Sequence, residues 1–170
     1  METMTQEDRE KLTDDFWKAV EDTRTVMLGT AFAKKVAARP MTAQIDDATG
    51  KHIIYFFASS EEGIGAEVLA GRHDALMTFT SKGHDLFASC DGPLSLVEDE
   101  ALIDRLWSVF ASLYYEDSRR DPKLLLLSFD PSEADVWRSS TTGFLKSVAY
   151  KLMGKDAGEA APEDRGKIQL

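Results

Sequence analysis

The feature that most constrains the fold of this chain is a series of apolar segments, rich in β-forming residues and separated by short turns. Pairs of such segments predict β-hairpins. Three hairpins are expected, with strands at 37–45 and 52–58, at 75–80 and 86–97, and at 123–129 and 133–138. A further short strand is expected at 25–30. Consecutive hairpins favour an antiparallel sheet and lack the regular βαβ alternation of a dinucleotide-binding fold.

Helical periodicity marks the segments between and around these strands. Helices are expected at 6–22, at 59–71, from residue 99 to about 113, and at about 143–153. Thr5 and Asp8 have the spacing of a capping box before the first helix, and Ser59 and Glu62 have the same spacing before the second. Asp99 is expected to cap the third.

The chain length and the strand pattern predict one mainly β domain with peripheral helices. A chain of 170 residues is the usual size of one domain. Six or seven strands in consecutive hairpins can close into a small barrel. We expect the domain to span residues 1–153, followed by a polar tail at 154–170 whose end, 166–170, can dock on it.

The charge and the cysteine content exclude several classes of function. Twenty Lys and Arg against 30 Asp and Glu give a net charge of −10, which disfavours nucleic acid and anionic membranes as partners. No apolar stretch approaches the ~18 residues of a transmembrane helix, and the acidic first residues do not resemble a signal peptide. A single cysteine, Cys90, forms no internal disulfide. These features predict a cytoplasmic protein.

Common catalytic and metal-binding motifs are not found in the sequence. No two of the three histidines are spaced i,i+4, and Cys90 alone completes no zinc set, so no metal is expected. No serine lies in a G-x-S-x-G setting. Gly63-Ile64-Gly65 has Val68 at the third glycine position of a dinucleotide fingerprint, which disfavours that function. Cys90 lies on an apolar strand and is expected to be a buried structural thiol.

Two short segments remain as candidates for an anion site. Pro40 has no amide donor and predicts an edge or a bulge, beside which Arg39 can present its guanidinium to a phosphate. Ser59 and Ser60 offer hydroxyls and helix N-terminal amides to the same kind of ligand. Alternatively, Arg39 pairs with a surface acid and Ser59 only caps a helix. The residues alone leave both interpretations open.

An ordered set of segments resembles a known family. Arg39-Pro40-Met41, then Tyr55-Phe56-Phe57-Ala58-Ser59, then Leu106-Trp107 and Val136-Trp137 occur in its order and spacing. The sequence resembles the bacterial general stress protein branch of the pyridoxamine 5'-phosphate oxidase-like FMN-binding split barrels, over nearly the whole chain. The resemblance implies a six-stranded antiparallel split β-barrel. It also implies a homodimer with FMN in two clefts at the interface, and a flavin-dependent oxidoreductase activity.

The resemblance also implies which residues bind the flavin. It places Arg39 near the phosphate, residues 57–59 along the isoalloxazine and ribityl chain, and Trp137 near the dimer interface. Together with the hydroxyl of Ser60, the candidate cofactor residues are Arg39, Pro40, Met41, Phe57, Ala58, Ser59, Ser60 and Trp137. Trp107, Trp137, Tyr114 and Tyr115 are candidate interface aromatics, with core packing as the alternative.

One departure from the family pattern bears on the phosphate. The family often has a lysine in the first turn of the helix after the serine, and Ile64 stands at that position. Glu61 and Glu62 add negative charge beside it. The loss of one charge-assisted contact costs about 1.5–3 kcal/mol. Lys34 or Lys35 can compensate if the fold brings either of them near.

Two other hypotheses therefore accompany FMN binding. In one, the split barrel has lost FMN and acts as a small-molecule binding or interaction protein. In the other, the same barrel holds haem or a deazaflavin. Haem would need an axial histidine or cysteine, and the sequence places none of them for that purpose.

Overall fold

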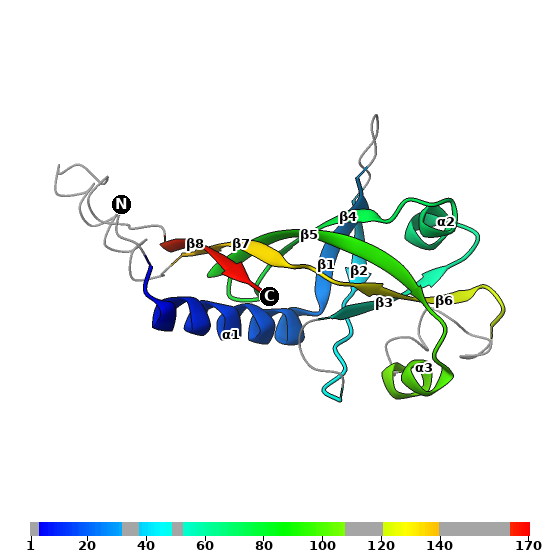
Figure 1. Cartoon of the computed structure of the whole chain (residues 1–170), viewed down its shortest axis with the longest axis horizontal. Coiled ribbons are helices and arrows are strands. Elements are labelled where there is room, and N and C mark those ends of the chain that lie inside the picture. Colours follow the sequence, from blue (N-terminus) through cyan, green and yellow to red (C-terminus); the bar gives the residue numbers. More distant parts are fainter. Residues whose placement is uncertain (1–3, 32–37, 49–52, 108–120, 140–163) are drawn as a thin grey trace.

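The computed structural model describes residues 4–31, 38–48, 53–107, 121–139 and 164–170, and the structural statements below concern these residues. They form three helices and eight strands (Figure 1). The helices are α1 (Gln6–Thr23), α2 (Gly63–Leu69) and α3 (Glu100–Leu106). The strands are β1 (Thr25–Thr30), β2 (Arg39–Thr42), β3 (Ile54–Ser59), β4 (Asp74–Thr80), β5 (Leu86–Val97), β6 (Leu124–Phe129), β7 (Glu133–Arg138) and β8 (Asp164–Gln169).

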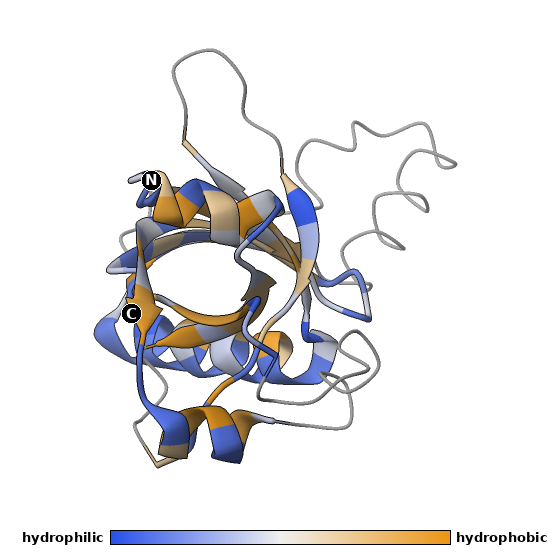
Figure 2. Ribbon diagram, turned by 90° about the vertical axis from the view of Figure 1, so that its right-hand side faces the viewer, coloured by the Kyte–Doolittle hydropathy of each residue, from blue (hydrophilic) through white to orange (hydrophobic). Residues whose placement is uncertain are grey.

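Six of the strands form an antiparallel sheet that nearly closes into a barrel. Their order is β2-β1-β4-β5-β6-β3, and an isolated bridge between Gln44 and Tyr55 brings the chain after β2 back against β3. The long strand β5 pairs with β7 through residues 86–91 and with β6 through residues 94–97. The strands curve into a ring in Figure 2. The predicted mainly β, split-barrel fold is confirmed. Of the three predicted hairpins, however, only that of β4 and β5 forms among the described residues: β2 pairs with β1 and meets β3 through a single bridge, and β6 and β7 both pair with β5 instead of with each other.

The two remaining strands extend the sheet beside β5. β7 pairs with β5, and β8 pairs with β7 along its whole length. α1 lies against β8, and α2 and α3 lie toward the other end of the barrel (Figure 1). The C-terminal residues 164–169 thus form the outermost strand of this extension.

Alternation along the strands builds the core. On β1 and β4, Val26, Leu28, Met77 and Phe79 point inward and are buried. The amphipathic helix α1 packs Phe16 against Phe79 with ring centroids 5.5 Å apart. Burial of side chains of this size supplies about 1.5–3 kcal/mol each before the loss of chain entropy.

The predicted helix starts are correct where the cap is local. The Thr5 hydroxyl accepts a hydrogen bond from the Asp8 amide, and the Asp8 carboxylate accepts one from the Thr5 amide, so the capping box is confirmed. Asp99 accepts from the amide of Leu102 at the start of α3. None of the described helices is long and apolar enough to span a bilayer.

The predicted cap at Ser59 is wrong. Ser59 is the last residue of β3 and pairs with Leu124, and α2 begins only at Gly63. The Ser59 Oγ accepts instead from the amide of Glu61, 3.2 Å away. The ladder between β3 and β6 therefore extends one residue further than the local spacing suggests.

Several expected elements are shorter or lie outside the described residues. β2 covers 39–42 of the strand expected at 37–45. α3 is described as far as Leu106, and residues 108–120 of the expected helix and its loop lie outside. The expected helix at 143–153 and the turn residues 49–52 also lie outside.

Candidate functional site

Arg39 is held at the rim of the barrel by an acid on α2. Its Nη2 lies 3.1 Å from Oε1 of Glu67. The other oxygen of that carboxylate accepts a hydrogen bond of 2.5 Å from the hydroxyl of Thr30, which is buried on β1. Three elements, β1, β2 and α2, thus fix the orientation of the guanidinium, and the predicted pairing of Arg39 with an acid occurs.

The second terminal nitrogen of Arg39 has a different environment. Nη1 is buried and has no hydrogen-bond partner among the described residues. A Cβ added to Gly63 would lie 3.8 Å from Cδ, Nε and Nη1 of Arg39, so the guanidinium rests against the turn between β3 and α2. Because a buried charged donor without an acceptor is costly, this geometry fits an oxygen of an anionic ligand.

The carboxylate that holds Arg39 is ionised at neutral pH. Burial raises the pKa of Glu67, but the hydrogen bonds from Thr30 and Arg39 outweigh it, and the pKa lies below its ordinary value of 4.5. Glu67 therefore neutralises part of the arginine charge. A phosphate at this position would share Arg39 with Glu67 rather than meet a free cation.

The turn at residues 59–63 carries a second cation that sequence reasoning missed. The amide of Ser60 donates to the carbonyl of Lys123, 2.8 Å away, just before β6. Nζ of Lys123 lies 2.9 Å from Oε2 of Glu61. The hydrogen bond to Glu61 and its negative charge raise the pKa of Lys123. Only the register of β3 against β6 reveals this lysine, since it is 62 positions from Glu61 in the sequence.

The glycines of Gly63-Ile64-Gly65 serve the backbone of this turn. Gly63 has φ of +64°, a conformation that a residue with a side chain adopts only at a cost. A Cβ on Gly65 would lie 2.1 Å from the carbonyl oxygen of Ser59, so α2 packs directly on the end of β3. Ile64 is buried in the core at 2% exposure. Ile64 is therefore an apolar core residue and offers no charge to this turn.

The other predicted residues on β2 and β3 lie near this turn, but with different surroundings. Phe57 packs edge-on against Trp107, with ring centroids 5.5 Å apart. For Trp107 this contact agrees with packing inside the chain, the alternative to a place at the dimer interface. Ala58 is buried in the main core. Pro40 is exposed opposite Met27, and Met41 packs partly buried against the core. The ligand roles of these residues remain predictions.

Trp137 lies on another part of the sheet. It pairs with Phe87 and lines a cavity of about 550 Å³ on the outward face of β1, β4, β5 and β7. The strand order puts β1, β4 and β5 between Arg39 and Trp137. Four strand spacings of about 4.8 Å amount to roughly 19 Å along the curved sheet. Arg39 is also paired with the inward-facing Leu28 and Trp137 with the exposed Phe87, so the two side chains lie on opposite faces of the sheet within one chain.

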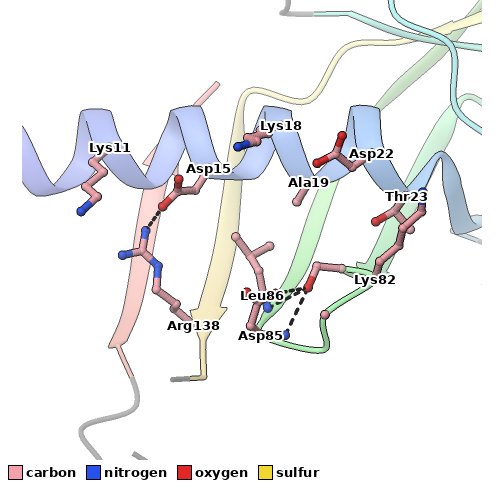
Figure 3. Close-up of a pocket in the computed structure, with 12 residues that line it drawn as sticks. Lys11, Asp15, Lys18, Ala19, Asp22, Thr23, Lys82, Asp85, Leu86 and Arg138 are labelled. Atoms are coloured by element: carbon pink, nitrogen blue, oxygen red, sulfur yellow. Dashed lines mark hydrogen bonds and ion pairs between the residues drawn. The ribbon is translucent and has the colours of Figure 1, made fainter. Parts of the chain in front are cut away.

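A second cavity lies between α1 and the turn from β4 to β5 (Figure 3). Its volume is about 570 Å³, and side chains of both charges line it. Arg138 pairs with Asp15, and Asp85 accepts a hydrogen bond from Ser81. None of the predicted cofactor residues lines this cavity.

Cys90 and the described histidines offer no second reactive centre. Burial, with a smaller effect from the charge of Asp91, raises the pKa of Cys90 to about 12, so the group stays a thiol. The Nδ1 of His73 lies 2.9 Å from the Leu94 carbonyl oxygen, and His52 lies outside the described residues. Within the described part of the chain, no three His, Cys, Asp or Glu side chains gather as a metal site.

Several solved structures are similar to this chain over most of its length. A protein assigned as general stress protein 26 from Jannaschia sp. CCS1 is 26% identical, with a TM-score of 0.75 over 95% of this chain and 99% of that chain. A general stress family protein from Xanthomonas campestris pv. campestris is 41% identical, with a TM-score of 0.68 over 79% and 91%. The general stress FMN/FAD binding protein from Xanthomonas citri is also 41% identical, with a TM-score of 0.65 over 76% and 89%.

A search of curated protein sequences found no significant match. The sequence model of the family described as pyridoxamine 5'-phosphate oxidase like matches residues 11–159. That match spans most of the chain, including every described strand except β8. The chain therefore belongs to the pyridoxamine 5'-phosphate oxidase-like family.

Proposed function

We propose that this protein binds FMN and acts as a flavin-dependent oxidoreductase. The observation that carries the proposal is the guanidinium of Arg39, with Nη1 buried, unpartnered among the described residues, and set against the turn at 59–63. A phosphate oxygen satisfies such a donor through a charge-assisted hydrogen bond. The relative from Xanthomonas citri, described as an FMN/FAD binding protein, supports the same ligand.

The residues present divide the work of holding the cofactor. Arg39 would bind the phosphate, kept in place by Glu67 and Thr30. The Ser59 hydroxyl, which accepts from the Glu61 amide, can also donate to a ligand. When bound, FMN supplies the redox chemistry by accepting a hydride or electrons. The chain needs no acid–base pair of its own for that step, and it contributes orientation and electrostatics.

We propose a homodimer as the form in which the site is complete. Arg39 and Trp137 lie apart in one chain, so a flavin that meets both would have to lie between two copies. The outward face around Trp137 supports this arrangement, because Met27, Leu76 and Phe87 are 40%, 40% and 39% exposed on it. Exposed apolar side chains gathered on one sheet face mark an interaction surface.

We further propose that the protein works in the cytoplasm, on a small molecule. Its net charge of −10 repels nucleic acid and anionic lipid surfaces. Its single cysteine is free and buried, which suits a reducing compartment.

The second candidate is a split barrel that no longer takes FMN. Two observations favour it: Arg39 is already paired with Glu67, and the buried Ile64 supplies no charge. Glu61 and Glu62 also oppose an incoming phosphate. In that case the same fold serves another small molecule or a protein partner.

A titration with FMN separates the two candidates. We expect wild-type protein to quench FMN fluorescence on binding. Arg39→Ala should lower the affinity about ten- to a hundredfold, the value of one charge-assisted contact. Arg9→Ala, which removes an exposed arginine from α1, is the matched control and should bind as wild type does. Wild-type protein that ignores FMN supports the second candidate. Equal affinity of wild type and Arg39→Ala removes the role assigned to Arg39.

A further inference from the structure

The turn between β3 and α2 has an unfavourable charge balance for a phosphate. Arg39 reaches it from β2, and Lys123 reaches it from the start of β6. Against these two positive charges stand three negative ones, from Glu61, Glu62 and Glu67. If FMN binds here as proposed above, its phosphate adds negative charge to a turn whose own charges sum to about −1. Arg39 can offer Nη1 to the phosphate without leaving Glu67. A further cation that turned from its carboxylate to the phosphate would lower the remaining repulsion.

The two cations differ in how they are held. Arg39 donates to one carboxylate oxygen of Glu67, and the hydroxyl of Thr30 donates to the other. The Glu67 carboxylate is therefore fixed by two hydrogen bonds. The pair of Lys123 with Glu61 is more open: its side chains are 55% and 61% exposed. An ion pair this exposed contributes little stability and exchanges partners readily.

The backbone of Lys123 is nevertheless fixed to the turn. Its carbonyl accepts the amide of Ser60, and the next residue, Leu124, pairs with Ser59 at the end of the ladder. The base of the lysine side chain is thus anchored at the same turn that Arg39 rests against, while its ammonium group lies in an exposed ion pair with Glu61. Long lysine side chains reach several ångströms from a fixed Cα and bind phosphate as a point charge.

We propose that Lys123 is a phosphate-binding residue, which leaves Glu61 for the flavin phosphate and supplies the positive charge that Ile64 does not. This inference rests on the proposed function. The phosphate-binding lysine would then come from the residue before β6, and not from the first turn of α2, where the family resemblance expects it. Glu61 then acts as a competitor that holds the ammonium group when no phosphate is bound.

Riboflavin provides the test, because it lacks the phosphate but keeps the isoalloxazine and ribityl groups. We expect Lys123→Gln to weaken FMN about threefold to tenfold and to leave the riboflavin affinity unchanged. The binding advantage of FMN over riboflavin should also become less sensitive to salt. Lys82→Gln is the matched control, since Lys82 is an exposed lysine at the far end of β4, and it should change neither affinity. Unchanged melting temperatures exclude a folding defect.

A second background separates direct contact from simple neutralisation of Glu61. If Lys123 binds the phosphate, Lys123→Gln weakens FMN in the Glu61→Gln background as well, and Glu61→Gln alone tightens FMN. If Lys123 only cancels Glu61, its effect disappears once Glu61 is neutral, and the inference is overturned. An equal loss for FMN and riboflavin, or no loss for either, also overturns it. If wild-type protein binds riboflavin and FMN equally, there is no phosphate site, but flavin binding itself stands. If wild-type protein binds neither flavin, the proposed function is contradicted.

Discussion

The inward and outward faces of the same strands differ sharply in this barrel. On β1, Leu28 is fully buried, whereas its neighbour Met27 is 40% exposed on the other side of the sheet. On β4, Met77 is fully buried and the adjacent Leu76 is 40% exposed. The inward face is a closely packed core, whereas the outward face carries exposed apolar side chains beside polar ones. Because the interior is filled by side chains, the flavin and the second copy proposed above would have to bind at the outside and the rim of this barrel.

The largest expected effect comes from breaking the inward face. Leu28→Ala should lower the free energy of unfolding by about 2–5 kcal/mol, because a fully buried leucine leaves a cavity. Met27→Ala is the matched control one residue away and should cost less than about 1 kcal/mol in dilute protein. Urea denaturation measures both. Similar losses for the two variants would show that the two faces are equally packed.

A smaller effect is expected from placing a charge on the outward face. Phe87→Asp should leave the fold intact but raise the dimer dissociation constant about a hundredfold, since central aromatic residues dominate interface energies. Leu69→Asp is the control: this leucine is 53% exposed on α2, away from the sheet face. Sedimentation velocity over a range of concentrations gives the answer. A Phe87→Asp protein that dimerises as tightly as wild type excludes this face as the interface.

At the rim between the two faces, the ion pair of Arg39 and Glu67 should make the stability of the fold depend on pH. The pKa of Glu67 is below its ordinary value of 4.5 in the folded protein, because Thr30 and Arg39 outweigh its burial. Its stabilising contribution is therefore present above about pH 4.5 and is lost as the pH falls through the folded value. Glu67→Gln should flatten the fall in melting temperature in that acid range. An unchanged acid profile would mean that the pair of Arg39 and Glu67 contributes no stability.

The last prediction is that the Cys90 thiol on the inward face does not react with a thiol reagent in the native protein. With a pKa of about 12, Cys90 is ionised to about one part in ten thousand at pH 8, and it is buried. A thiol reagent should therefore leave native protein unmodified and react fully once denaturant is added. Rapid modification of native protein would show that the core opens at β5.

Local sequence signals predicted the fold better than the site. The caps at Thr5 and Asp99 depend on residues three positions apart, and both are present. The strands at 25–30 and 75–80 are present, but Val26-Met27-Leu28 and Ala75-Leu76-Met77 are continuous apolar runs, so the sequence alone does not mark which of these residues are exposed. The cap at Ser59 fails for the opposite reason, since pairing with a strand 65 positions later decides where β3 ends.

The site depends on contacts that no local pattern contains. Arg39 and the signal for an anion were visible in the sequence, but its partner Glu67 is 28 residues away on α2. Lys123 enters the turn only through the register of β3 and β6. The separation of Trp137 from Arg39 depends on the order of the strands, which hairpin signals alone do not fix. The anion site at Arg39 therefore stays a prediction, and the tertiary pairing determines the charge balance around it.

The most direct test of the central claim is the visible absorption spectrum of the purified protein before and after addition of FMN. We expect a flavin spectrum that shifts on binding and saturates at one FMN per chain, with Arg39→Ala requiring more FMN to reach the same endpoint. A protein that is colourless as purified and does not change the spectrum of excess FMN would contradict it. The rim at Arg39 would then be a structural ion pair, and the barrel would serve a ligand other than flavin.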